Sequence, residues 1–191
     1  QEDVRERAVG ELAVRYHIDR AQALRVENTA VELLRQVAQP WGLTGEDNER
    51  LLRWASLLHE IGLSVTHSQY HKHGAYLLSY LDMPGFATGE QQRLAALVRG
   101  HRRKVPLAEW QRLPVAQQPR VLRLGVLLRL ACLLHRRRSE EAQGPVEVSV
   151  ENGTLKLRFA VGWLDAHALT RADLEQEAVY LKAANIKLKF K

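Results

Sequence analysis

The sequence has little cysteine or methionine and no long apolar run. Cys132 is the only cysteine, which excludes an internal disulfide and is typical of a reducing compartment. No stretch approaches the roughly 20 uncharged residues of a membrane-spanning helix, and the polar first residues do not resemble a secretory signal. We therefore expect a cytoplasmic protein that does not enter a membrane. Met83 is the only methionine, so we also expect that the chain is a fragment or a processed form.

The common catalytic motifs are also missing. The sequence contains no glycine-rich phosphate loop, no Gly-x-Ser-x-Gly turn, no Cys-x-x-Cys pair and no His-Glu-x-x-His motif. Aromatic residues make up 6% of the chain, and its tryptophans are not interleaved with basic residues as on a surface that stacks nucleic-acid bases. No recognition helix is indicated either, so we expect no specific nucleic-acid partner.

Positive charge is concentrated in one block of the chain. The formal net charge is +6, yet twelve Lys or Arg residues and a single acid, Glu109, lie between Arg93 and Arg138. Such a block attracts phosphate-rich partners, and the forked guanidinium of arginine matches phosphate oxygens. A solvated helical surface is the alternative explanation of the same pattern.

The spacing of apolar residues predicts a mainly helical chain with a small α+β unit at its end. Between Pro106 and Pro119 we expect a connection with at most short helical turns. Alternating residues on both sides of Asn152-Gly153 predict an antiparallel hairpin, because this dipeptide tolerates the positive φ of a tight turn. A helix capped by Thr170 and a strand over 186–190 follow. The main helices are expected over 4–16, 19–38, 44–60, 70–81, 89–102 and 121–137.

These elements predict two domains and a degenerate metal site. We expect a helical domain over 1–140 and the α+β domain over 144–191. His59-Glu60 resembles the His-carboxylate pair of HD-type phosphohydrolases, whose metal site also needs an earlier His and a later Asp. Gln22 and Cys132 stand at those two places. We therefore expect no bound metal, and we interpret His59 and Glu60 as a vestigial pair in which His59 packs inside the bundle.

The residues around this pair form the candidate site. For the histidines at 67, 71 and 73 we rank phosphate contact first, packing second and metal binding third. The basic cluster at the end of the fifth helix contains more donors than capping of a helix dipole requires. We expect phosphate binding that strengthens as histidines gain protons. The candidate binding residues are His71, Lys72, His73, Arg99, His101, Arg102, Arg103 and Lys104.

The chain resembles the C-terminal region of bacterial exopolyphosphatases and guanosine pentaphosphate phosphohydrolases. This resemblance implies an HD-like helical domain followed by a small α+β domain, and two actin-like domains that precede them in the intact protein. It further implies that the catalytic residues lie in those domains and none in this chain. The matching stretches are RYHID at 15–19, LRWASLLHEIGL at 52–63, HKHGAY at 71–76, DMPGF at 82–86, LVRGHRRK at 97–104 and LRLGVLL at 122–128.

The resemblance also implies partners and a function. Members of the family dimerise through this region, whose basic residues help to line a channel for inorganic polyphosphate. We therefore expect a polyphosphate-binding and dimerisation domain of an exopolyphosphatase, whose intact form uses Mg²⁺ and releases terminal phosphate. His101 in the basic cluster favours this branch. The same region of a guanosine pentaphosphate phosphohydrolase is the first alternative, and an independent metal-dependent HD phosphohydrolase is the second. Chain-length preference is not indicated by the sequence.

Overall fold

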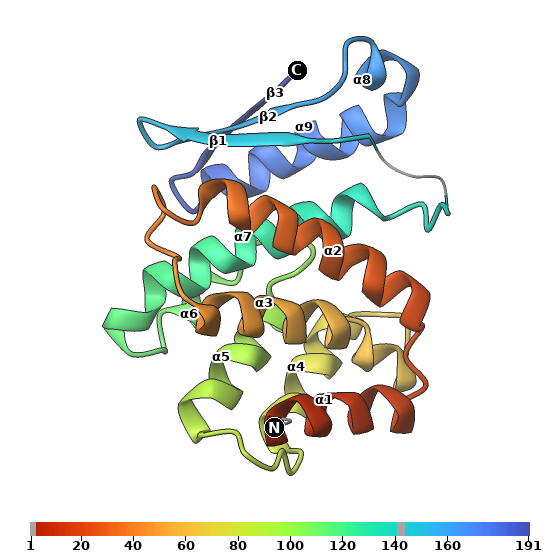
Figure 1. Ribbon diagram of the computed structural model, residues 1–191, viewed down its shortest axis with the longest axis vertical. Coiled ribbons are helices and arrows are strands. Elements are labelled where there is room, and N and C mark those ends of the chain that lie inside the picture. Colours follow the sequence, from red (N-terminus) through yellow and green to blue (C-terminus); the bar gives the residue numbers. More distant parts are fainter. Residues whose placement is uncertain (1–2, 141–143) are drawn as a thin grey trace.

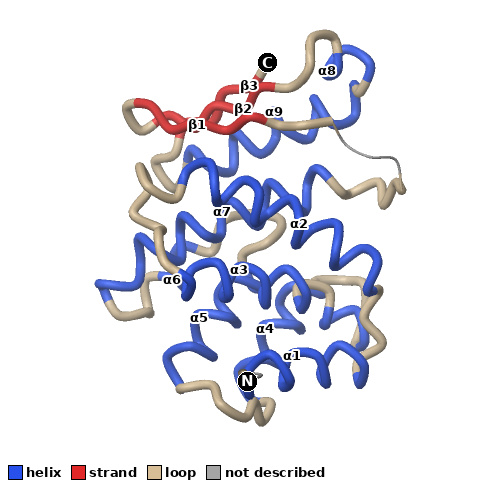
Figure 2. Tube along the Cα trace, in the orientation of Figure 1, coloured by secondary structure: helices blue, strands red, loops and turns tan. Residues whose placement is uncertain are grey.

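The structure is a computed structural model that describes residues 3–140 and 144–191 (Figures 1 and 2). Helices dominate the described residues, and a small sheet lies near the C-terminus. Two short 3-10 turns cover Ile61–Ser64 and Val115–Gln117. The helices are α1 (Val4–Arg15), α2 (Arg20–Val37), α3 (Glu46–Leu58), α4 (Tyr70–Tyr80), α5 (Thr88–Arg99), α6 (Leu107–Trp110), α7 (Gln118–Leu134), α8 (Trp163–Ala166) and α9 (Ala168–Lys182); the strands are β1 (Glu147–Glu151), β2 (Thr154–Arg158) and β3 (Lys187–Phe190).

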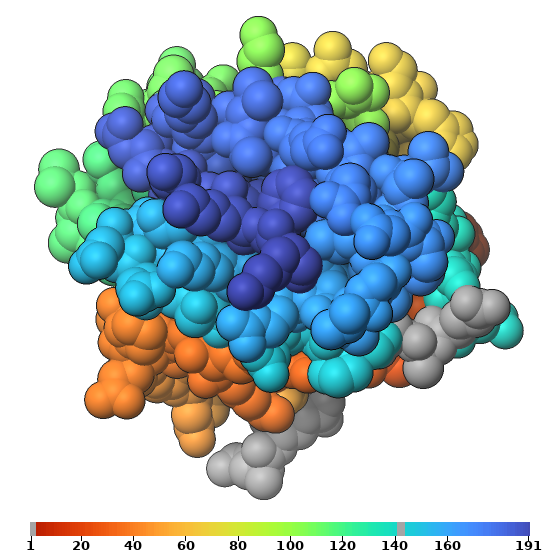
Figure 3. All heavy atoms as spheres, turned by 90° about the horizontal axis from the view of Figure 1, so that it is seen from above, coloured from red at the N-terminus to blue at the C-terminus, as the bar shows by residue number. Residues whose placement is uncertain are grey.

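The elements lie in successive layers, as Figure 1 shows. The sheet covers one side of α9, α9 packs on α7, and α7 packs on α2. Below them α3 contacts α1 and α5, and α4 packs against α5. From above, the C-terminal unit covers this end of the helical layers (Figure 3). The predicted fold class, mainly α with a small α+β unit, is therefore confirmed.

One hydrophobic core runs through the described layers. It extends from Val9 in α1 through Trp54 and Leu127 to Leu188 in β3, all of them buried. The division at about residue 140 stays a prediction, since residues 141–143 lie outside the described residues. Among the residues described, no helix combines the length and apolar character needed to cross a membrane.

The hairpin forms as its sequence predicts. Strands β1 and β2 are antiparallel, and Asn152 and Gly153 have φ values of 50° and 76° at the turn. Leu155 and Leu157 point into the core, where each is 1% exposed. Strand β3 pairs in parallel with β2, so the chain crosses over through α8 and α9 between the two strands.

Three predicted boundaries are wrong for physical reasons. Helix α5 ends at Arg99 rather than at 102, because the chain turns at Gly100 and Arg103 has a left-handed φ of 65°. Pro119 does not lie in the connection but in the first turn of α7, where its missing N–H has no helical partner to lose. Thr170 lies inside α9, which begins at Ala168 after the unpredicted α8.

Candidate functional site

A pocket of about 600 Å³ brings most of the candidate residues together. We call it the basic pocket. It is formed by the start of α4, the end of α5, the loop that follows α5, and Tyr180 of α9. Its lining includes six of the eight candidates, namely His71, Lys72, Arg99, Arg102, Arg103 and Lys104.

The charges of the basic pocket are largely unbalanced. Arg99 forms an ion pair with Glu109 at 3.1 Å, and Glu109 is the only acid among the lining residues. Within the described part of the chain, no carboxylate pairs with Arg102, Arg103 or Lys104. An anion in this pocket would therefore meet several cations that have no counter-charge of their own.

Arg102 is held in place without an acid. Its guanidinium lies over the ring of Tyr70 at 4.4 Å, and its Nη1 donates to Nδ1 of His71 over a long 3.4 Å. Burial, with help from Arg103 and Arg136, lowers the pKa of Arg102. Stacking on an aromatic ring leaves the other guanidinium N–H groups available for a phosphate.

His71 contributes to the pocket as a neutral ring. Burial and the neighbouring arginines lower its pKa to about 4. Because Nδ1 accepts from Arg102, the proton of neutral His71 lies on Nε2, which can donate to a phosphate oxygen. Titration of His71 therefore falls well below neutral pH.

The remaining histidines differ in position. His101 is 3% exposed, and its Nδ1 lies 2.6 Å from the carbonyl oxygen of Val98, so its ring is not on the surface. His73 is half-buried on α4 and does not line the basic pocket. His67 lies before α4 and does line it. Phosphate contact is also the first expectation for His67, although the predicted binding set does not include this residue.

A buried arginine fixes the loop that carries the basic cluster. Arg129 of α7 donates to the carbonyl oxygens of Gly100 at 2.7 Å and Arg103 at 2.5 Å. The same guanidinium forms a two-point ion pair with Glu177 of α9, at 2.7 and 2.9 Å. The one sequence signal for this residue is an arginine within an apolar helix, and the pattern alone assigns it no role.

A second pocket of about 540 Å³ adjoins the basic pocket and contains His59 and Glu60. We call it the histidine pocket. Both pockets are lined by Arg102, Arg103 and Tyr180. The histidine pocket is further lined by Gln22, His59, Glu60, Tyr70, His101 and Cys132, with Arg136, Arg138 and Asp173 among its outer residues.

The donor groups of the histidine pocket do not fit a metal ion. Both oxygens of Glu60 accept from Arg138, at 2.8 and 3.1 Å. The Gln22 amide donates to the carbonyl of His135 and accepts from Arg25. Burial raises the pKa of the Cys132 thiol, which disfavours the thiolate that binds metals. Among the residues described, no three His, Cys, Asp or Glu side chains are grouped to hold a metal.

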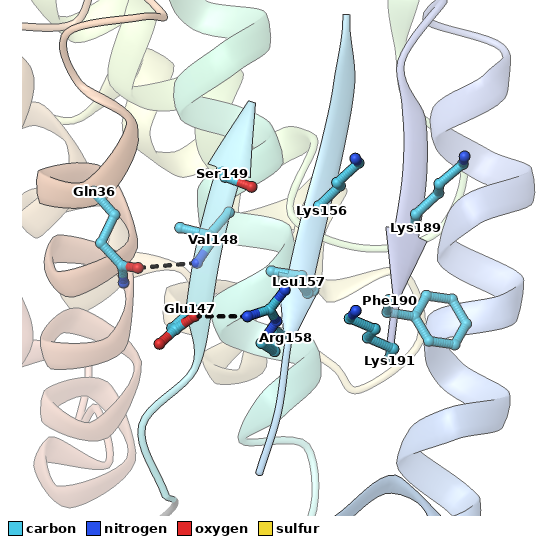
Figure 4. A pocket seen from close by; sticks show the side chains of 10 residues that line it. All are labelled: Gln36, Glu147, Val148, Ser149, Lys156, Leu157, Arg158, Lys189, Phe190 and Lys191. Carbon is cyan, nitrogen blue, oxygen red and sulfur yellow. Dashed lines mark hydrogen bonds and ion pairs between the residues drawn. The ribbon is translucent and has the colours of Figure 1, made fainter. Parts of the chain in front are cut away.

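A third pocket, of about 750 Å³, lies over the sheet and contains none of the candidate residues (Figure 4). Gln36 of α2 accepts from the backbone N–H of Val148 there, so part of its wall is structural. Lys156 is paired with Glu151 at 2.6 Å, and Arg158 lies 3.9 Å from Glu147. Lys189 and Lys191 also line this pocket. The basic pocket gathers more cations without an acid partner among the described residues, so we favour it as the anion site.

Comparison with known proteins identifies the family. The family model described as Ppx/GppA phosphatase, domain III, matches residues 4–178. A guanosine-5'-triphosphate,3'-diphosphate pyrophosphatase of Vibrio cholerae is 39% identical over 179 residues, which are 93% of this chain and 35% of that protein. A protein of the same name from Pseudoalteromonas translucida is 34% identical over 176 residues, 92% of this chain and 35% of its own length.

The chain thus spans about one third of the length of these relatives, and it matches the model of one domain along nearly all of its residues. The resemblance inferred from the sequence motifs is confirmed. This chain belongs to the Ppx/GppA phosphatase family, as its domain III.

Proposed function

We propose that this chain binds the phosphate groups of the substrate of a guanosine pentaphosphate phosphohydrolase, with the basic pocket as the binding site. The observation that carries this proposal is a set of cations, centred on Arg102 and Arg103, in one pocket of about 600 Å³. These cations have no acid partner within residues 3–140 and 144–191. The names of the relatives support the guanosine pentaphosphate branch, which the sequence analysis had placed second. His101, which had favoured the exopolyphosphatase branch, is buried and does not discriminate between them.

Binding of long inorganic polyphosphate is the second candidate function. The cations of the basic pocket contact phosphate oxygens and do not require a nucleoside, so a linear polyanion satisfies them equally well. In either case we assign hydrolysis to the preceding actin-like domains, with Mg²⁺, and propose a homodimer of the intact protein. We expect no phosphate release from either substrate by this chain alone.

The proposal can be tested by titrating the purified chain with guanosine pentaphosphate and, separately, with long-chain polyphosphate. Affinity is expected to fall steeply between about 50 and 200 mM salt, because each neutralised phosphate releases counterions. Substitution of Arg102, Arg103 and Lys104 by Ala together is expected to weaken binding and to reduce the salt slope by about two units. Tighter binding of guanosine pentaphosphate than of a polyphosphate of similar charge would select the first candidate.

A matched control removes the same charge elsewhere. Arg15, Arg20 and Arg35 are exposed on α1 and α2 and do not line either pocket. Their joint substitution by Ala lowers the net charge equally and is expected to leave most of the affinity. If both triple variants bind like the parent chain, the basic pocket is only a solvated surface. If both weaken binding equally, net charge alone attracts the ligand.

A further inference from the structure

We propose that the histidine pocket binds a terminal phosphoryl group in its singly protonated form. The P–O–H group donates to Nε2 of His101, while other phosphoryl oxygens accept from Arg102 and Arg103. This inference deepens the proposed function, because it separates a chain-end compartment from the basic pocket that holds the preceding phosphates. It assigns a ligand to a pocket that lacks a fitting set of metal donors.

His101 supplies a buried acceptor for which the described part of the chain offers no partner. Its Nδ1 lies 2.6 Å from the carbonyl oxygen of Val98, and a carbonyl can only accept, so the ring proton is on Nδ1. Burial keeps the pKa of His101 well below its usual range, and the ring is neutral. Its Nε2 therefore presents a lone pair, and this atom is buried without a hydrogen-bond partner among the described residues. A group that brings its own proton satisfies this atom.

The groups beside His101 are neutral as well. His59 has the same arrangement, with Nδ1 lying 2.6 Å from the carbonyl of Ser56, and burial lowers its pKa. Burial raises the pKa of Tyr70 to about 12 and also raises that of Cys132, so both keep their protons. The inner part of the pocket thus offers polar atoms without charge, beneath a rim of arginines.

The acids that face the pocket are already paired. Glu60 is paired with Arg138. On α9, Asp173 is paired with Arg136 and Arg137, and Glu177 with Arg129. Arg102 and Arg103 are left as cations without a carboxylate within the described residues. The pocket therefore attracts an anion, and the unpaired charges lie at its junction with the basic pocket.

The junction makes the two pockets one continuous path. Arg102, Arg103 and Tyr180 line both of them, so a ligand held by Lys72 and Lys104 can reach the histidine pocket without leaving these arginines. Arg102 lies over Tyr70, whose ring centroid is 5.3 Å from that of His101. Nε2 of His101 is buried, so a bound anion reaches it only when the side chains around it shift.

The chemistry of this acceptor selects chain ends. A terminal phosphoryl group has a second pKa of about 6 and carries a proton in a substantial fraction of molecules near neutral pH. An internal phosphate linked on both sides has no such proton and cannot donate to Nε2. Linear polyphosphate and the 3'-diphosphate or 5'-triphosphate of a guanosine nucleotide all supply the required group.

The test compares linear tripolyphosphate with cyclic trimetaphosphate, which has three phosphates and no chain end. Calorimetric titration of the parent chain is carried out between pH 6 and 8.5. The linear ligand is expected to bind more tightly than the cyclic one, by about tenfold at the lower pH. Its affinity is expected to fall as the pH rises and the terminal proton is lost. Simple charge attraction predicts the opposite trend, because the linear ligand becomes more negative.

The cyclic ligand has no terminal proton, so a change of its affinity with pH would come from titration of the protein itself. Its affinity is expected to change little over the same range. His101→Asn keeps a donor toward Val98 and removes Nε2, and it is expected to bring the linear ligand down to the affinity of the cyclic one. Lys72→Ala, in the basic pocket alone, is expected to weaken both ligands alike. If His101→Asn does not fold, the two ligands on the parent chain still decide the question.

Two further arms separate the possible failures. Equal affinities and equal pH trends for the linear and cyclic ligands would overturn the chain-end site and leave the basic pocket intact. Absence of binding by both would overturn the proposed function itself. Titration of the parent chain and of His101→Asn with guanosine pentaphosphate, and separately with long polyphosphate, distinguishes the two sources of the terminal phosphoryl group. The ligand whose affinity is lowered by His101→Asn is the one whose end enters the pocket.

Discussion

Gly62 lies where the chain leaves the vestigial pair and passes beneath the first turn of α4. A Cβ atom there would lie 1.9 Å from the carbonyl oxygen of Tyr70 and 2.6 Å from the backbone N of Gly74. Because backbone cannot yield as a flexible side chain does, Gly62→Ala is expected to destabilise the fold by about 1–3 kcal/mol or more. Urea unfolding measures this change.

The matched control for that substitution is Gly10→Ala in α1. A Cβ at Gly10 meets no atom within 4 Å, and alanine is the better helix former. This variant is expected to gain about 0.5–1 kcal/mol. Equal stabilities of the two alanine variants would contradict the close approach of α4 to Gly62.

Neutral buried histidines make the fold sensitive to mild acid. The pKa of His71 is about 4 in the folded chain, against about 6.5 for a free histidine, and the pKa values of His59, His101 and His135 are lowered too. The unfolded chain therefore binds more protons between these values. The free energy of unfolding is expected to have its full value above about pH 6.5 and to decrease as the pH drops toward 4.

His71→Gln removes one of these groups and is expected to reduce the loss of stability between pH 7 and 4.5. Urea unfolding at a series of pH values tests this expectation. Asp3, whose pKa is lowered to about 2, loses its contribution only at more acid pH, so it does not obscure the histidine window. A free energy of unfolding that is constant from pH 7 to 4.5 would contradict the neutral, buried state of these rings.

At the scale of elements, the contact between α7 and α9 holds the loop that carries the basic cluster. Arg129→Met leaves Glu177 buried without its partner and is expected to cost about 3–5 kcal/mol of stability. Arg129→Met with Glu177→Leu removes both charges and is expected to recover most of that stability. Neither residue belongs to the basic pocket.

The double variant separates folding from binding. The carbonyl oxygens of Gly100 and Arg103 lose their donor in it, so the loop is no longer fixed. Polyphosphate affinity is therefore expected to stay low although the fold has recovered, as thermal unfolding and titration of the same sample would show. Parent-like affinity in the stable double variant would mean that the loop holds its shape without Arg129.

The elements that the sequence predicts correctly are those with a strong local signal. Asp19 caps α2 and accepts from the backbone N–H of Gln22, and Asn152-Gly153 forms the hairpin turn. The pattern could not predict the parallel pairing of β3 with β2, because it depends on contacts made far along the chain. The same reason applies to Arg129 and Glu177, whose pairing brings together residues 48 positions apart.

The candidate site could be predicted in part. The basic cluster was visible as a run of arginines, and Lys72, Arg102, Arg103 and Lys104 do line one pocket. The sequence could not show that the chain turns at Gly100, which buries His101 while Arg103 and Lys104 stay exposed. In a histidine-rich segment, packing rather than composition decides which histidine ring faces solvent.

At the scale of the whole molecule, the chain is expected to form a dimer. Large apolar side chains are exposed on α1 and α4, and the rings of Tyr76 and Tyr80 lie against each other at the surface of α4. Sedimentation of the purified chain should show a species of twice the monomer mass at micromolar concentration. A monomer well above that concentration would show that this region does not dimerise alone.

The order in which the chain is synthesised gives the ion pair between Arg129 and Glu177 a further meaning. The ribosome releases the basic loop and α7 before α9 has been made, and the earlier parts of a protein begin to fold first. During that interval Arg129 lacks its acid, and the face of α7 that α9 later covers is open to solvent, so the loop has only part of its support. A nascent chain interrupted before α9 would thus lack the full support of this loop, and the proposed capture of phosphate-rich ligands would wait until α9 has been made.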